Sequence, residues 1–426
     1  MAEAKTGKTL VEKIIARASG QARVRPGEIV TCKVDLAMIL DSGGPRRIWP
    51  RLKELGVGVW DPEKIVLCAD HFVPAVDAET AAILKLTRDF AREFNIKHFY
   101  DMVGIGHIVL AEHGHLAPGM FACGGDSHSP MGGAFGCYMA GFGGIEMTGV
   151  VITGDIWTRA PETIRVEWSG TFGTAVTAKD IALTLCRELG MDNAFKAIEY
   201  GGDTVRAMAM PERMVLTNMA AELGAETGVI EPDEITLNAM RAGGRTPDKD
   251  ALSWRSDTDA QYASVHKFDA NALSPQVAAP HAPSNSGPVG DYKNVKIDQA
   301  YIGACVGAKL EDLHMVAAVL KGRKIAATTR LLVAPASKKI YAKAAADGTL
   351  ATLVEAGATM LASGCGACAA MGAGILAENE VCIASTNRNF QGRMGATSAS
   401  VYLGSPYTVA AAAVAGHITD PREFVS

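Results

Sequence analysis

Ile65-Val66-Leu67-Cys68 is a short apolar run that is followed at once by the polar pair Asp70-His71. Continuous apolar runs of this length are typical of strands buried on both faces of a parallel sheet. Met120-Phe121-Ala122-Cys123 is a second such run, and it leads into Gly125-Asp126-Ser127-His128. A helix predicted from about residue 77 to 94 separates the two, so strand, polar cluster and helix alternate. This rhythm indicates an α/β fold, in which ligands bind beyond the carboxyl ends of the strands.

The C-terminal third repeats the pattern. Strands are predicted over Ile325 to Ala334, Thr359 to Ala362 and Val381 to Thr386, with a helix over 337–347. Cys365 follows the second of these strands, and Asn387-Arg388 follows the third. We therefore expect a site in this part of the chain that faces the first across a cleft.

A chain of 426 residues is too long for one ordinary core, so we expect several domains. The predicted α/β domains cover 1–160, 161–273 and 291–426, and the proline-rich stretch 274–290 is interpreted as a linker. Capping-box patterns predict helices that begin after Thr9 and after Thr177.

Composition excludes several classes of protein. Hydrophobic residues make up 48% of the chain and charged residues 20%, which is typical of a well-buried globular protein. The net charge of -5 without a basic cluster argues against nucleic-acid binding. No signal peptide or membrane span is expected, so a cytoplasmic location is the default. Nine scattered cysteines do not suggest a disulfide framework, and in a reducing compartment they are core residues or metal ligands.

The Cys365-Gly366-Ala367-Cys368 motif can aim two thiolates at one metal centre. By itself this spacing fits a zinc half-site, a thioredoxin-like redox pair, an iron–sulfur ligand pair or a chance occurrence. Cys305 lies 60 positions before Cys365 and could supply a third thiolate.

An ordered set of motifs resembles the aconitase superfamily, most closely the large subunits of isopropylmalate dehydratase. The set comprises Asp70-His71, Gly106-His107-Ile108, Gly125-Asp126-Ser127-His128, Asn218 to Glu222, Cys305, Cys365-x-x-Cys368 and Asn387-Arg388-Asn389-Phe390-x-Gly392-Arg393. It extends over nearly the whole chain. The resemblance implies three aconitase-type α/β domains around a central cluster cleft, without the mobile fourth swivel domain.

The resemblance implies a 4Fe-4S cluster held by Cys305, Cys365 and Cys368, with Asn387 as a hydrogen-bonding neighbour. Three thiolates leave one iron open, as a Lewis acid requires. A structural zinc site of three cysteines and one histidine is the alternative, although the 60-residue spacing is long for a zinc ribbon.

The resemblance also implies catalytic and substrate-binding residues. Asp70 would orient His71, and His71 would protonate the departing hydroxyl as a general acid; in isolation, an Asp-His dipeptide is more often a surface turn. His107, Asp126 and His128 would form a hydrogen-bond network around that hydroxyl. A carboxylate at Glu222 would fix the His128 tautomer, and the spacing of four from Asn218 would place both on one helical face. Substrate contacts are expected from Ser127, Asn218, Arg388 and Arg393, where the two arginines would clamp carboxylates unless they are ordinary surface residues.

Two features depart from the family pattern. Relatives usually follow the first cysteine with Thr-Asn-Ser or Thr-Asn-Gly, whereas Val306-Gly307-Ala308 stands here. The resemblance also implies that this chain lacks the family's fourth domain, which supplies a serine base and another arginine. We therefore expect a small swivel-domain subunit as the partner that completes the active site.

The expected activity is that of a hydro-lyase acting on a small di- or tricarboxylate. The leading substrate is 3-isopropylmalate, which would place the enzyme in leucine biosynthesis. Dimethylmalate, citramalate and homocitrate or homoaconitate are alternative substrates. The alternative functions from other classes are a zinc enzyme, a cluster-free RNA-binding or regulatory protein and a degenerate large subunit without turnover. Metal analysis, salt-sensitive RNA retention and an assay with an authentic partner would distinguish them.

Overall fold

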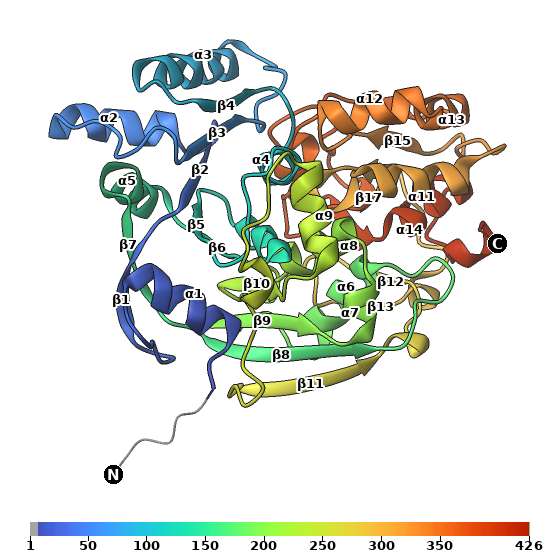
Figure 1. The fold of residues 1–426 in the computed structure, drawn as a ribbon. Coiled ribbons are helices and arrows are strands. Elements are labelled where there is room, and N and C mark those ends of the chain that lie inside the picture. The colour runs from blue at the N-terminus through green and yellow to red at the C-terminus, as the bar shows by residue number, and fades with distance from the viewer. Residues whose placement is uncertain (1–6, 426) are drawn as a thin grey trace.

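The computed structural model describes residues 7–425, which form four β-sheets flanked by helices (Figure 1). Helix α1 (Leu10–Ser19) begins at the predicted capping box, in which the side chains of Thr9 and Glu12 each bond the other's backbone N–H. Strands β1 (Ile29–Lys33) and β7 (Asp155–Arg159) pair antiparallel beside it. Within residues 7–425, no helix combines the length and the apolar character needed to cross a membrane.

The first large sheet has five parallel strands in the order β4-β3-β2-β5-β6. Its strands are β2 (Leu36–Leu40), β3 (Ile65–Ala69), β4 (His98–Asp101), β5 (Phe121–Gly124) and β6 (Tyr138–Gly141). Helices α2 (Pro45–Leu55), α3 (Ala78–Glu93), α4 (Gly106–Glu112) and α5 (Gly144–Thr153) accompany it. Every residue of β2, β3 and β5 is buried, so the apolar runs are central parallel strands, as predicted.

The second sheet has four parallel strands in the order β10-β9-β8-β11 and lies along the lower side of Figure 1. They are β8 (Glu162–Ser169), β9 (Lys196–Gly201), β10 (Thr227–Ile230) and β11 (Ser264–Asp269). Its helices are α6 (Ala178–Glu188), α7 (Asp203–Ala207), α8 (Met210–Met219) and α9 (Glu234–Ala242).

The third sheet has seven strands in the order β13-β12-β18-β17-β14-β15-β16. Its strands are β12 (Gln276–Ala278), β13 (Ser286–Pro288), β14 (Gln299–Ile302), β15 (Arg330–Val333), β16 (Thr359–Met360), β17 (Val381–Ala384) and β18 (Ser400–Gly404). The accompanying helices are α10 (Ala304–Gly307), α11 (Leu310–Leu320), α12 (Lys338–Ala346), α13 (Thr349–Ala356) and α14 (Pro406–Ala415).

Two local predictions differ from this third sheet. The stretch interpreted as a linker contains β12 and β13, which form an antiparallel pair at the sheet edge, and β12 also pairs with β18. The predicted strand over 325–334 is shorter, because only 330–333 pair with β14. The α/β class itself is confirmed by parallel pairing throughout the first two large sheets and among five strands of the third, β18, β17, β14, β15 and β16.

The three large sheets share one apolar core. A single cluster of buried residues includes Met38 of β2, Ile198 of β9 and Ile302 of β14. The carboxyl ends of β3, β5, β14 and β17 can therefore contribute to one site.

Candidate active site

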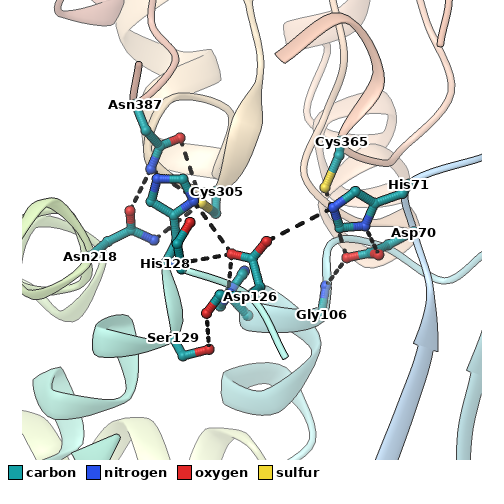
Figure 2. Close-up of polar contacts among 12 residues, drawn as sticks. Asp70, His71, Gly106, Asp126, His128, Ser129, Asn218, Cys305, Cys365 and Asn387 are labelled. Atoms are coloured by element: carbon teal, nitrogen blue, oxygen red, sulfur yellow. Dashed lines mark hydrogen bonds and ion pairs between the residues drawn. The ribbon is translucent and has the colours of Figure 1, made fainter. Parts of the chain in front are cut away.

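Asp70 and His71 form a buried pair at the carboxyl end of β3. His71 Nδ1 lies 2.7 Å from Asp70 Oδ1, and the side chains are 8% and 0% exposed (Figure 2). The other oxygen, Asp70 Oδ2, accepts the backbone N–H of Gly106 at 2.7 Å. A carboxylate held in this way accepts the Nδ1–H of His71, so Nε2 is the nitrogen left for chemistry.

Asp41 is a further carboxylate beside the Asp70-His71 pair, and the sequence motifs did not predict it. It follows β2, the strand beside β3, and is fully buried. It accepts the backbone N–H of His71 at 3.1 Å and that of Phe72 at 3.1 Å. The rule that identified Asp70, a polar residue after an apolar parallel strand, would also have found Asp41.

Asp126 lies among three histidine rings after β5. Its carboxylate is 3.9 Å from His71 Nε2 and 3.4 Å from His128 Nδ1 (Figure 2). The same carboxylate lies 3.4 Å from His107 Nε2. It also accepts the backbone N–H of His128 at 2.8 Å. The three sequence motifs that supply these histidines therefore meet at one carboxylate.

Burial and neighbouring charges shift the pKa values of the three histidines in different directions. Burial lowers the pKa of His71, but the charges of Cys365 and Asp70 and the contacts with Asp41 outweigh it and raise the pKa well above its ordinary value. Burial also lowers the pKa of His128, and bonds to Asp126 and Glu222 outweigh it and raise the pKa. For His107 burial prevails and lowers the pKa to about 4. The structure thus favours a charged His71 beside a neutral His107.

Glu222 joins His128 to Arg388. Its Oε1 lies 3.0 Å from His128 Nε2 and accepts from Arg388 Nε at 2.7 Å. Arg388 also donates to Ser127 Oγ at 2.8 Å. The expectation that Asn218 and Glu222 share a helical face is wrong, because α8 ends at Met219 and Glu222 lies in the turns that follow.

Cys305 receives two amide donors. Asn218 Nδ2 lies 3.1 Å and Asn387 Nδ2 lies 3.5 Å from its sulfur, and the two amides bond each other. Cys305, Cys365 and Cys368 line one cavity together with Asn387 and Arg393. These N–H donors favour the thiolate, the form that ligates metals, whereas burial outweighs them in the metal-free chain and raises the pKa of the Cys305 thiol to about 12.

The loop of Cys365 and Cys368 is held against Asp70. The backbone N–H of Cys365 donates to the Asp70 carbonyl at 2.8 Å. A Cβ added to Gly364 would lie 2.7 Å from that carbonyl oxygen, so only glycine allows this approach. The cysteine motif of the third sheet therefore lies directly against the Asp70-His71 pair of the first.

The unusual Val306-Gly307-Ala308 segment has a packing explanation. Val306 and Ala308 are buried, and a Cβ on Gly307 would lie 2.2 Å from Ser385 Oγ. Ser385 Oγ in turn donates to the Gly307 carbonyl at 3.2 Å. The segment packs closely against the end of β17, and the polar contacts of Cys305 come from Asn218 and Asn387 instead.

Several buried polar atoms in and beside the cavity have no hydrogen-bond partner among residues 7–425. They include both ring nitrogens of His107 and Arg393 Nε in the cavity, and Glu222 Oε2 beside it. Unsatisfied buried groups of this kind are rare in native proteins unless a further molecule bonds to them. The donor set of three thiols lining one cavity, with amide donors to Cys305, fits an iron–sulfur centre.

Comparison with known proteins identifies the family. The profile of the Aconitase family (aconitate hydratase) matches residues 13–295 and 290–416. The chain belongs to the aconitase family. The 3-isopropylmalate dehydratase large subunit 1 of Methanopyrus kandleri is 45% identical over 98% of this chain and 100% of its own length. The corresponding large subunit of Hydrogenobaculum sp. is 40% identical over 99% of both chains. A probable methanogen homoaconitase large subunit of Methanothermobacter thermautotrophicus is 42% identical over 97% of both.

Membership of the aconitase family makes the chain a hydro-lyase, as the sequence motifs predicted. Enzymes of this family use an iron–sulfur cluster. The similarity extends from end to end of relatives that are themselves large subunits, so the motif residues belong to one continuous match.

Proposed function

We propose that this chain is the cluster-carrying large subunit of a dehydratase that interconverts 3-isopropylmalate and 2-isopropylmalate. The observation that carries the proposal is the convergence of Asp70-His71, three cysteines and Arg393 on one cavity. The names of the relatives support the substrate, and homoaconitate is the second candidate because one relative is a homoaconitase.

The three cysteines are the ligands in this proposal. When bound, a 4Fe-4S cluster held by Cys305, Cys365 and Cys368 would supply an open iron as a Lewis acid for the substrate hydroxyl and a carboxylate. Asn218 and Asn387 orient Cys305 through their amide N–H groups. Arg393 binds a substrate carboxylate through its guanidinium, whose buried Nε has no hydrogen-bond partner in the described part of the chain.

His71 acts as the general acid. Asp70 holds its Nδ1–H, and Nε2, directed toward Asp126, delivers a proton to the departing hydroxyl. Asp126 and His107 accept and donate hydrogen bonds around that oxygen, and Arg388 holds Ser127 and Glu222 at the cavity edge. The naming of the relatives as large subunits supports a small-subunit partner. In this proposal that swivel-domain subunit supplies the base that removes the carbon-bound proton.

A zinc site is the second candidate for the metal. One ligand atom each of Asp70, His71 and Cys365 lie within 4.8 Å of one another, a spacing that one ion could bridge. Zinc commonly takes histidine, cysteine and carboxylate ligands together.

Metal analysis of protein purified without oxygen separates the two. Iron and sulfide near four per chain in the wild type, both lost in Cys365→Ser, would support the cluster. The wild type combined with a small subunit should then convert 3-isopropylmalate faster than homoaconitate. Stoichiometric zinc without sulfide would overturn the mechanism, and a preference for homoaconitate would overturn the substrate.

A further inference from the structure

Lys179 is a buried lysine that reaches the site from the second sheet. It lies in the first turn of α6, is 2% exposed, and donates through Nζ to the carbonyl of Thr386. Thr386 directly precedes Asn387. Lys179 Nζ also lies 3.9 Å from the sulfur of Met219, the residue after Asn218. One side chain therefore touches both segments whose amides contact Cys305.

The ammonium of Lys179 has no carboxylate partner. Among residues 7–425, no carboxylate oxygen is recorded within 4.0 Å of it. Lys309, the other fully buried lysine, differs in this respect because it pairs with Asp312 at 2.7 Å. A buried charge without a counter-ion is strongly unfavourable, so an anionic group must face Lys179 in the working protein.

Three of the acidic groups that act electrostatically on Lys179 belong to the site: Glu222, Cys368 and Cys305. Burial lowers the pKa of Lys179 to about 8, against the opposing effects of Glu222, Cys186, Cys368 and Cys305. Two of these four are proposed cluster ligands, and ligation requires both to be thiolates. Binding the cluster therefore adds negative charge on the side that Lys179 faces.

We propose that Lys179 is a positioning residue for the iron–sulfur centre: its ammonium balances the charge of the ligating thiolates, and its hydrogen bond fixes the segment that carries Asn387. This inference rests on the proposed function. The second sheet supplies none of the proposed ligands. Through Lys179 it would instead help to set the midpoint potential of the iron–sulfur centre and the retention of its iron.

The alternative is that Lys179 only anchors Thr386. Lys179→Met removes the charge and the hydrogen bond, Lys179→Gln keeps an N–H donor without the charge, and Lys179→Arg keeps both. If Lys179 is only an anchor, Lys179→Met loses the stabilising hydrogen bond to Thr386 whether or not the cluster is present. A charge that compensates thiolates would matter only when the cluster is bound.

The test compares thermal unfolding of each variant with and without the cluster, in full-length protein prepared anaerobically. Without the cluster, Lys179→Met should melt near the wild-type temperature, because removal of the unpaired buried charge offsets the loss of the hydrogen bond to Thr386. With the cluster, Lys179→Met and Lys179→Gln should melt below the wild type and release iron several-fold faster in air. Lys179→Arg should restore most of the wild-type behaviour.

The midpoint potential, followed by EPR, gives a second measurement. Removal of a nearby positive charge should shift the oxidised-to-reduced ratio about tenfold toward the oxidised form, about 59 mV for one electron. Wild-type iron and sulfide content tests the proposed function separately. The proposal for Lys179 is overturned by one combination of results: the wild type holds the cluster, but Lys179→Met lowers the melting temperature equally with and without it and leaves the midpoint potential unchanged.

Discussion

At the scale of single residues, His71 concentrates the acid chemistry of the site. Asp70 and Asp41 approach it from two neighbouring strands and favour its protonated form. His71→Asn keeps a similar size but cannot transfer a proton, so kcat should fall by about 10²- to 10⁴-fold. Iron content should stay unchanged, because His71 is not a proposed ligand. His314→Asn, at an exposed histidine paired with Asp347, is the matched control and should leave kcat unaffected. Retention of kcat in His71→Asn would assign the acid elsewhere.

Arg393 is the second residue that a single substitution can test. Its buried Nε finds no hydrogen-bond partner between residues 7 and 425, so a substrate carboxylate is the group expected to satisfy it. Lysine keeps the charge but loses the planar fork, which removes one or more charged hydrogen bonds. Arg393→Lys should raise KM about 10- to 100-fold, equivalent to a charged bond of about 1.5–3 kcal/mol. Arg422→Lys, at a half-exposed arginine paired with Asp420, should leave KM at the wild-type value. A fall in kcat alone would instead place Arg393 outside substrate binding.

At the scale of elements, the approach of the cysteine loop to β3 sets the position of the ligands. A Cβ at Gly364 would lie 2.7 Å from the Asp70 carbonyl, a distance that forces the loop outward. Gly364→Ala should lower the free energy of unfolding by about 1–3 kcal/mol and reduce iron per chain. Gly149→Ala is the matched control, since it lies inside α5 with no atom within 4 Å of an added Cβ. It should be neutral or stabilising by up to about 1 kcal/mol. Full iron content in Gly364→Ala would show that the loop adapts.

Elements with local signals were predictable from the sequence, and those fixed by distant pairing were not. The capping boxes of α1 and α6 and the buried runs of β3 and β5 follow from side chains within a few residues. Strand β12 is three residues long and exists because β13 and β18 bond it, which no local pattern reveals.

The candidate site follows the same division. The ordered motifs brought Asp70, Asp126, Cys305 and Arg388 into one hypothesis, and the structure places all four around the same region. Lys179 carries no motif, and its importance depends on Thr386, which is 207 positions away. Glu222 was assigned to a helix because the spacing of four fits a turn of helix, whereas α8 ends before it.

At the scale of the whole molecule, the shared core implies that charge at the junction of the second and third sheets affects global stability. Glu212 of α8 accepts the backbone N–H of Ala178 at the start of α6 and lies beside Glu311 and Tyr407. Burial raises the pKa of Glu212 from its ordinary value of 4.5 to about 7. The folded chain therefore holds a proton between these pH values that the unfolded chain has lost. Stability from this group is complete below about pH 4.5 and declines as the pH rises toward 7.

Glu212→Gln tests this linkage because glutamine keeps the acceptor for Ala178 and does not titrate. The variant should flatten the pH dependence, with a gain over the wild type of about 1–2 kcal/mol at pH 8 that disappears by pH 4.5. The measurement is the urea midpoint of cluster-free protein between pH 4.5 and 8. Glu234→Gln, at an exposed carboxylate on α9, should reproduce the wild-type profile. Parallel profiles for Glu212→Gln and the wild type would mean that Glu212 ionises normally in the folded chain. In that case the junction would be hydrated rather than part of the common core.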